Sequence, residues 1–147
     1  MYKHILIPVD GSTLSEKAIE KGVAVARALK ARITAFTALD EYQAPSESAI
    51  LSRTAASPAE YEKRARERAQ ALLGGLAERA RAAGVDCDTD YALSDRPWDA
   101  IIRAAKKHGC DLIVMASHGR GRLGALLQGS ESLGVLSHSD IPTLIYR

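Results

Sequence analysis

The 147-residue sequence has only two cysteines, Cys87 and Cys110, which lie far apart and form no Cys-x-x-Cys pair. A dithiol redox motif and a structural zinc site are therefore not indicated. The histidines at positions 4, 108 and 138 are scattered as well, and their spacing predicts no metal site. We expect two small, buried thiols.

A large excess of charge of one sign is missing, because 20 lysines and arginines nearly balance 18 acids and leave a net charge of +2. Such a weak surplus argues against nucleic acid as the main partner. Long apolar runs are also missing, because the first one is interrupted at Pro8 and Asp10. We therefore expect no signal peptide, no membrane span and a cytoplasmic location. No internal repeat or linker divides the chain, so residues 1–147 are expected to form one domain.

What the sequence does contain is a regular alternation of strand and helix patterns. Short apolar runs predict strands at 1–9, 31–39, 85–93, 112–115 and 141–146. Helical periods lie between them, at 13–29, 58–83, 97–109 and 131–139. This alternation predicts an α/β fold, an open five-stranded parallel sheet with helices on both faces.

Local signals predict how two of the helices begin, those at 13–29 and 97–109. Thr13 and Glu16 have the spacing of a capping box. Ser94 or Asp95 is expected to cap the helix that contains Pro97 in its first turn.

Two segments depart from regular patterns. Residues 40–57 have no period, which predicts a lid or a disordered insertion. Gly74 and Gly75 lie inside the long helix at 58–83 and cost it about 2 kcal/mol relative to alanines. Close packing or a kink is expected at this glycine pair.

The most informative stretch is 111–130, DLIVMASHGRGRLGALLQGS. A buried strand leads into a glycine-rich turn, and Gly129-Ser130 then opens the last helix. Glycines allow backbone N–H groups to approach a phosphate, and a helix N-terminus offers unpaired donors. This order of elements is typical of an anion-binding site.

Several common sites do not fit these residues. The G-x-G-x-x-G from Gly119 to Gly124 has no acidic residue about 20 positions later, and no Gly-Lys-Ser/Thr follows the glycines. Ser117 and His118 lack a nucleophile elbow and an orienting group, so catalysis there is not indicated. After Asp10, the second aspartate of a dehalogenase-like phosphotransferase and the acidic cluster of a receiver domain are both missing.

The same stretch resembles the C-terminal signature of the universal stress protein family, which is glycine, two residues, glycine, nine residues, glycine and serine or threonine. Gly119, Gly129 and Ser130 match the last three positions, and Ala116 replaces the first glycine. The opening ILIPVDGS and the strand exit DLIVMASHG also resemble the family, so the resemblance covers essentially the whole chain.

This resemblance implies the strand order 3-2-1-4-5 of a Rossmann-like, adenine nucleotide alpha hydrolase-like fold. Strands one and four then become neighbours, and their carboxyl ends flank the crevice where the sheet order reverses. Asp10 and the segment 116–119, about a hundred residues apart, are expected to meet there.

The resemblance also implies a site for adenine nucleotide. The expected adenine slot consists of Pro8, Val9, Ala38 and Met115, with Asp10 accepting hydrogen bonds from the base or ribose. The expected ribose and phosphate side consists of Ala116, Ser117, His118, Gly119, Arg120, Arg122, Gly129, Ser130, Glu131 and Ser132. Simpler interpretations stay open: Asp10 as a turn residue, Met115 as core, and both arginines as solvated loop residues.

Three functions are compatible with these residues. The first is an ATP-binding stress-response switch, with or without Mg and with at most weak hydrolysis or autophosphorylation. The second is a nucleotide-free dimeric scaffold, which the alanine at position 116 favours. The third, a small-molecule enzyme, is disfavoured because no acid/base pair is evident. A homodimer is expected through the apolar last strand, from Ile141 to Tyr146.

Overall fold

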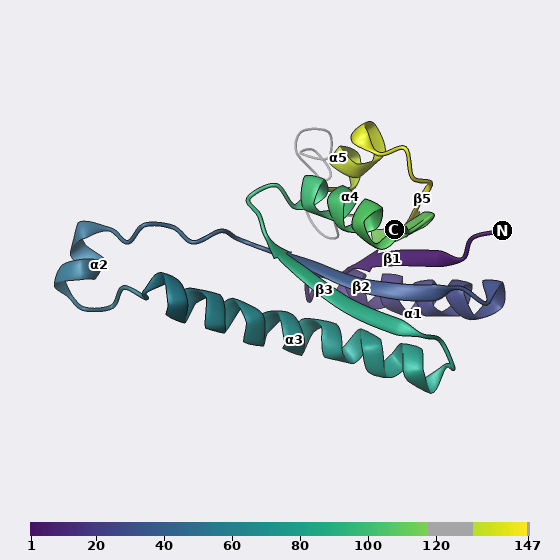
Figure 1. Cartoon of the computed structure of the whole chain (residues 1–147), viewed down its shortest axis with the longest axis horizontal. Coiled ribbons are helices and arrows are strands. Elements are labelled where there is room, and N and C mark those ends of the chain that lie inside the picture. The colour runs from purple at the N-terminus through teal and green to yellow at the C-terminus, as the bar shows by residue number, and fades with distance from the viewer. Residues whose placement is uncertain (118–130, 147) are drawn as a thin grey trace.

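In the computed structural model, which describes residues 1–117 and 131–146, five parallel strands form one sheet in the order β3-β2-β1-β4-β5 (Figure 1). This confirms the predicted fold class and strand order. The strands are β1 (His4–Pro8), β2 (Arg32–Leu39), β3 (Cys87–Leu93), β4 (Leu112–Ala116) and β5 (Thr143–Tyr146). The helices are α1 (Thr13–Leu29), α2 (Glu47–Leu51), α3 (Pro58–Ala82), α4 (Pro97–His108) and α5 (Glu131–His138).

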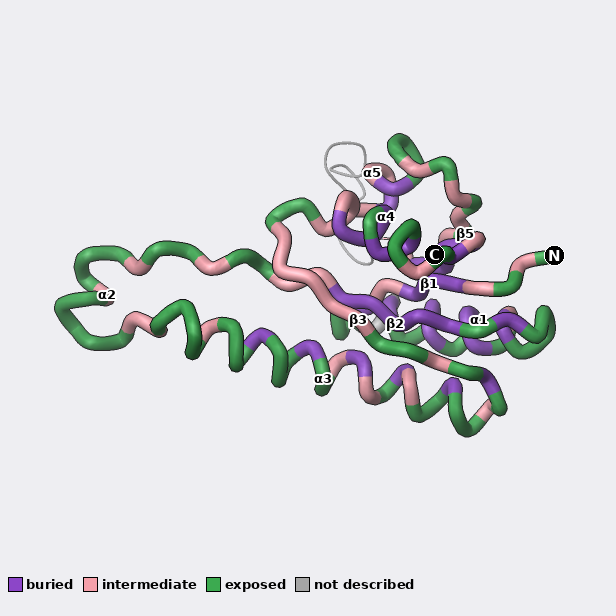
Figure 2. Tube along the Cα trace, in the orientation of Figure 1, coloured by how far each residue is buried: buried purple, intermediate pink, exposed green. Residues whose placement is uncertain are grey.

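The central strands of the sheet are buried on both faces because helices pack on each side of it (Figures 1 and 2). Ile5 and Ile7 of β1 belong to the core beneath α1 and α3. Leu6, between them, points to the opposite core beneath α4 and α5. All three side chains are fully buried, as a central parallel strand requires.

The helix starts differ from the sequence-based predictions. Ser12, not Thr13, caps α1, because its extended backbone directs its hydroxyl to the amide of Ser15. Arg96 precedes α4 and no side chain caps that helix. Ser94 instead accepts a hydrogen bond from the Arg96 amide, at 3.1 Å, so it shapes the turn before the helix.

Residues 40–57 form an arm that projects from the body together with the first turns of α3 (Figures 1 and 2). The expectation of a segment without regular structure is wrong at its tip, where Ser46 caps the short helix α2. No residue of α2 is buried. At the end of the arm, Ser57 and Glu60 form the capping box of α3.

The glycine pair in α3 is not explained by close packing. A Cβ added at Gly74 or Gly75 would meet no atom within 4 Å, and neither residue has a positive φ. We therefore expect Gly74→Ala and Gly75→Ala each to raise the free energy of unfolding by about 0.5–1 kcal/mol, since alanine restricts the unfolded chain and favours helix. Urea unfolding monitored by circular dichroism measures this gain. Unchanged or lower stability in both variants would contradict it.

Of the two cysteines, only Cys110 is buried, and Cys87 is half-buried. Burial raises the pKa of the Cys110 thiol to about 11, so it stays protonated at neutral pH. Within the described residues, no helix has the length and apolar character needed to cross a membrane.

Asp90 of β3 is a half-buried carboxyl that links the sheet to the end of α4. Its Oδ2 lies 2.8 Å from Lys107 Nζ and 2.7 Å from His108 Nε2. Burial favours the neutral form of this carboxyl, but the hydrogen bonds to Lys107 and His108 outweigh that effect and hold its pKa below the ordinary 3.8.

A carboxyl whose pKa is lowered by folding stabilises the protein above its unfolded pKa, and this stabilisation is lost on acidification below about pH 4. We expect Asp90→Asn to lower stability at pH 7 and to weaken the loss of stability between about pH 5 and pH 3. Urea midpoints across this range test it, with the exposed Asp86→Asn as the matched control. Equal pH profiles for Asp90→Asn and the unmodified protein would contradict the assignment.

Candidate functional site

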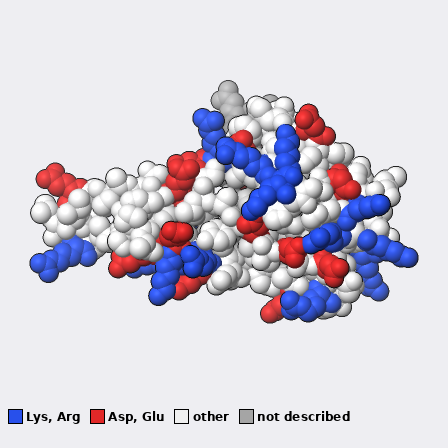
Figure 3. All heavy atoms as spheres, in the orientation of Figure 1, with Lys and Arg blue, Asp and Glu red and all other residues white. Residues whose placement is uncertain are grey.

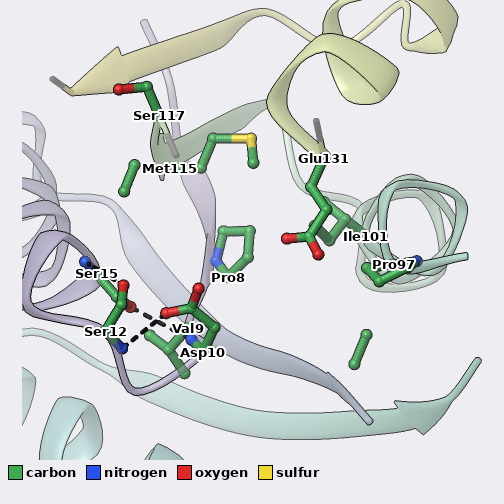
Figure 4. Close-up of a pocket in the computed structure, with 12 residues that line it drawn as sticks. Pro8, Val9, Asp10, Ser12, Ser15, Pro97, Ile101, Met115, Ser117 and Glu131 are labelled. Atoms are coloured by element: carbon green, nitrogen blue, oxygen red, sulfur yellow. Dashed lines mark hydrogen bonds between the residues drawn. The ribbon is translucent and has the colours of Figure 1, made fainter. Parts of the chain in front are cut away.

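A cavity of about 250 Å³ opens at the carboxyl ends of β1 and β4, where the strand order reverses (Figure 4). Open α/β sheets bind ligands at this position because the connections leave the sheet in opposite directions. The residues that line the cavity are Pro8, Val9, Asp10, Ser12, Ser15, Ala38, Pro97, Ile101, Met115, Ala116, Ser117 and Glu131.

The structure brings together most of the predicted site residues that it describes. Eight of them line the cavity: Pro8, Val9, Asp10, Ala38, Met115, Ala116, Ser117 and Glu131. Ser132 is buried in α5 and is not among the lining residues. The other predicted positions lie outside the described residues: His118, Gly119, Arg120, Arg122, Gly129 and Ser130.

Four lining residues were not predicted as part of the site: Ser12, Ser15, Pro97 and Ile101. Ser15 follows the cap of α1 by three residues, so its hydroxyl lies on the first turn beside Asp10. Pro97 and Ile101 lie one turn apart at the start of α4. Pro97 was the available signal for this wall of the cavity, because a proline in the first turn marks the start of a helix and this helix follows a strand that ends at the same sheet edge.

Asp10 is held at the mouth of the cavity by the turn that follows β1. Its Oδ1 accepts a hydrogen bond from the Ser12 amide at 2.8 Å, and its own amide lies 3.4 Å from Ser15 Oγ. Figure 4 shows the carboxylate pointing into the cavity. Asp10 therefore has the turn role considered for it and, in addition, offers an acceptor to a ligand.

Ala116, the residue that replaces the signature glycine, is the last residue of β4 and pairs with Tyr146. Among the described residues other than glycine, only Lys30 and Arg53 have a positive φ. The next amide, that of Ser117, donates to the Tyr146 carbonyl at 2.7 Å. The backbone at position 116 is thus ordinary strand and does not require glycine.

The electrostatics of the described lining are acidic. Asp10 and Glu131 face the cavity from opposite sides, and this part of the lining includes no lysine or arginine (Figure 4). Carboxylate oxygens are ligands that Mg²⁺ prefers, and Mg²⁺ uses one or two of them together with substrate phosphates. The residues therefore fit a nucleotide that carries Mg²⁺ on its phosphates. No group of three or more metal-binding side chains occurs in the described ranges 1–117 and 131–146.

The apolar part of the lining has the chemistry of a slot for a planar base. Pro8 and Val9 line it from the end of β1, Ala38 from β2, and Met115 from β4. Ile101 of α4 completes this lining. Such a slot with a few polar groups at its rim is the usual build of a cofactor site.

Comparison with known proteins identifies similar chains over this whole length. The family model of the universal stress protein family matches residues 1–147. A universal stress protein of Thermus aquaticus is 32% identical over 152 residues, covering 100% of both chains.

Two solved structures have the same fold. A universal stress protein in complex with cAMP has a TM-score of 0.73 and 24% identity, covering 99% of this chain and 97% of the other. The universal stress protein from Archaeoglobus fulgidus in complex with dAMP has a TM-score of 0.65 and 16% identity, covering 99% and 98% of the two chains.

Proposed function

Since this chain belongs to the universal stress protein family, we propose that it binds ATP in the cavity between β1 and β4 and acts as a nucleotide-dependent switch in the stress response. The observation that carries this proposal is the cavity itself. Two stretches about a hundred residues apart, Pro8–Asp10 and 115–117, line it together at the position where the sheet order reverses. The relatives with bound cAMP and dAMP support an adenine nucleotide as the ligand.

In the proposed complex, adenine lies in the apolar slot beside Val9 and Met115. Asp10 accepts a hydrogen bond from the amino group of the base or from a ribose hydroxyl. The phosphates extend toward the start of α5, where Glu131 holds Mg²⁺ together with them. ATP hydrolysis or autophosphorylation, if present, is weak, and the proposed role depends on binding alone.

The test is thermal unfolding of the nucleotide-free protein with and without Mg-ATP, with GTP as the control. Ligand at about 100 times its dissociation constant stabilises by about 2.7 kcal/mol, which raises the midpoint by about 5–10 °C for a domain of this size. The fluorescence of Trp98 provides a second signal for binding, because this residue adjoins the lining residue Pro97. Its ring is stacked on His138, with centroids 4.4 Å apart. No response to millimolar ATP would instead support the nucleotide-free scaffold.

We also propose that the chain forms a homodimer through β5. This strand is at the edge of the sheet, and Leu144 within it is 39% exposed. The exposed Met1 and Leu29 line a groove together with Leu144, so the apolar surface continues beyond the strand. An exposed strand edge with apolar residues is a template for pairing with another chain.

Light scattering tests the dimer. The unmodified protein is expected to elute as a dimer at micromolar concentration, and Leu144→Lys as a monomer with an unchanged circular dichroism spectrum. Leu51→Lys, which removes a more exposed leucine from the tip of the arm, is the control and should stay dimeric. A monomeric unmodified protein would overturn the proposal.

A further inference from the structure

A second cavity, of about 390 Å³, lies at the carboxyl edge of the sheet on the α3 side, and we call it the α3 cavity. Its residues are Asp10, Thr37, Ala38, Leu39, Asp40, Tyr61, Arg64, Ala65, Arg68 and Leu72. Among the residues that the structure describes, it shares only Asp10 and Ala38 with the cavity between β1 and β4. The two cavities are therefore neighbours that meet at the end of β1.

One wall of the α3 cavity is a single face of α3. Tyr61, Arg64, Ala65, Arg68 and Leu72 recur at helical spacing, so they line up along three turns. The helix is held against the end of β1, since a Cβ added at Gly11 would lie 2.9 Å from Leu72 Cδ2. Gly11 has a φ of +82°, so this turn combines two reasons for glycine.

The aromatic side chain at the mouth of this cavity is fixed in place. The Tyr61 hydroxyl donates to the carbonyl of Asp40 at 2.5 Å. Its ring meets that of Tyr42 edge to face, with centroids 5.6 Å apart. A ring held in this way is ready to stack on a ligand without further loss of side-chain freedom.

Arg64 and Arg68 differ from several other arginines of the molecule. Lysine and arginine side chains interleave with acidic ones over α3 (Figure 3), and Arg79 on the same helix pairs with Glu16. Neither Arg64 nor Arg68 forms an ion pair with any acid in the described part of the chain. Two guanidinium groups one turn apart that both line one cavity form a fitting receptor for a phosphate group.

The opposite wall carries the complementary chemistry. Asp10 and Asp40 line the α3 cavity from the ends of β1 and β2, with the apolar Ala38 and Leu39 between them in the same lining. The cavity therefore combines cations, carboxylates and an apolar surface. A simple inorganic anion uses only the arginines, whereas a phosphorylated organic molecule with hydroxyl or amino groups uses both walls.

We propose that the α3 cavity binds the phosphate group of a small phosphorylated metabolite on Arg64 and Arg68, with donor groups of the same ligand on Asp10 and Asp40. This phosphate comes from one of two sources. It belongs to a separate metabolite, or to a nucleotide whose base occupies the neighbouring cavity and whose phosphates pass over Asp10 to α3, an arrangement that would replace the one toward α5 proposed above. The shared chemistry is a phosphate held by two guanidinium groups.

The experiment is an NMR titration of the full-length, ¹⁵N-labelled chain with sodium pyrophosphate at constant ionic strength. Saturable shifts are expected at the amides of 61–72 and at Leu39 and Asp40. Arg64→Gln/Arg68→Gln should raise the dissociation constant of pyrophosphate at least about tenfold, since each lost charge-assisted hydrogen bond weakens binding by that factor or more. Lys63→Gln/Arg66→Gln removes the same charge from exposed positions of α3 outside the cavity and should change the affinity less than about twofold.

Repeating the titration in the presence of ATP separates the two sources. Undiminished pyrophosphate binding supports a separate metabolite, and competition together with weaker ATP binding by the Arg64/Arg68 variant supports the nucleotide's own phosphates. An absence of saturable shifts at millimolar pyrophosphate, or equal losses in both double variants, would overturn the proposal. Because pyrophosphate is titrated alone first, this outcome is independent of whether ATP binds the neighbouring cavity.

Discussion

Replacing Gly134 of α5 by alanine is expected to lower the free energy of unfolding by about 2 kcal/mol. The added Cβ would lie 2.4 Å from Trp98 Cγ and 2.7 Å from Trp98 Cβ. Because Trp98 Cβ is fixed to the backbone of α4, rotation of the side chain cannot relieve both contacts. Overpacking of this kind costs about 1–3 kcal/mol. Because these contacts are close, we expect a cost at the upper end, and the gain of about 1 kcal/mol in helix propensity reduces it to about 2 kcal/mol.

Urea unfolding of Gly134→Ala measures the effect, and Gly75→Ala is the matched control because its new Cβ meets no atom within 4 Å. The control should be more stable than the unmodified protein. Truncating the indole in Trp98→Ala/Gly134→Ala should reduce the cost of the second substitution without abolishing it, because alanine removes the ring atoms and keeps the Cβ of residue 98, and this reduction identifies the contact as the cause. Equal stability of the two single glycine variants would show that α5 does not pack against α4 at this point.

The contrast among these glycines shows where sequence reasoning reaches its limit. Gly74-Gly75 attracted attention as a pair inside a helix, yet it has open space around it. Gly134 is a single glycine in a short helix, and its close contact comes from α4, more than thirty residues earlier in the chain. Helical spacing alone predicts neither the open space at Gly74-Gly75 nor the close contact at Gly134, because each depends on which element packs against the glycine.

The fold was predictable because its signals are local and repeated. The run from His4 to Pro8 is apolar on both faces, so it predicts a strand buried between two layers of helices. Capping was less predictable, because Ser12 and Thr13 are adjacent and both are good caps. The extended backbone of Ser12 decides between them.

The lining of the candidate site was predicted at the strand exits and missed where α4 forms its wall. Asp10 follows the apolar run of β1, and Met115 is the last residue of the apolar run of β4. The predicted order makes these strands neighbours, so the meeting of the two residues followed from the topology. Pro97 and Ile101 belong to a helix whose apolar stripe serves both the core and the cavity. Periodicity marks such residues as buried, but it does not separate the last core residue from the first lining residue.

The size of the side chain at position 116 is expected to control nucleotide binding. Ala116 is half-buried, ends β4 and lines the cavity of about 250 Å³. Its backbone does not have the positive φ that would make glycine necessary. Ala116→Gly should therefore change the dissociation constant of ATP by no more than about fourfold, the equivalent of about 0.8 kcal/mol for one methyl-sized group.

Ala116→Phe should weaken ATP by at least about 100-fold, or about 2.8 kcal/mol, because a phenyl ring at this position competes directly with the ligand for the cavity. Calorimetric titration with Mg-ATP measures both variants, with Ser137→Phe on the exposed side of α5 as the control for added bulk. A gain well above fourfold in Ala116→Gly would mean that the alanine itself restricts binding. A small change in the dissociation constant of ATP in both Ala116→Gly and Ala116→Phe would instead place the nucleotide away from the end of β4, since the affinity of a ligand that contacts residue 116 depends on the size of its side chain.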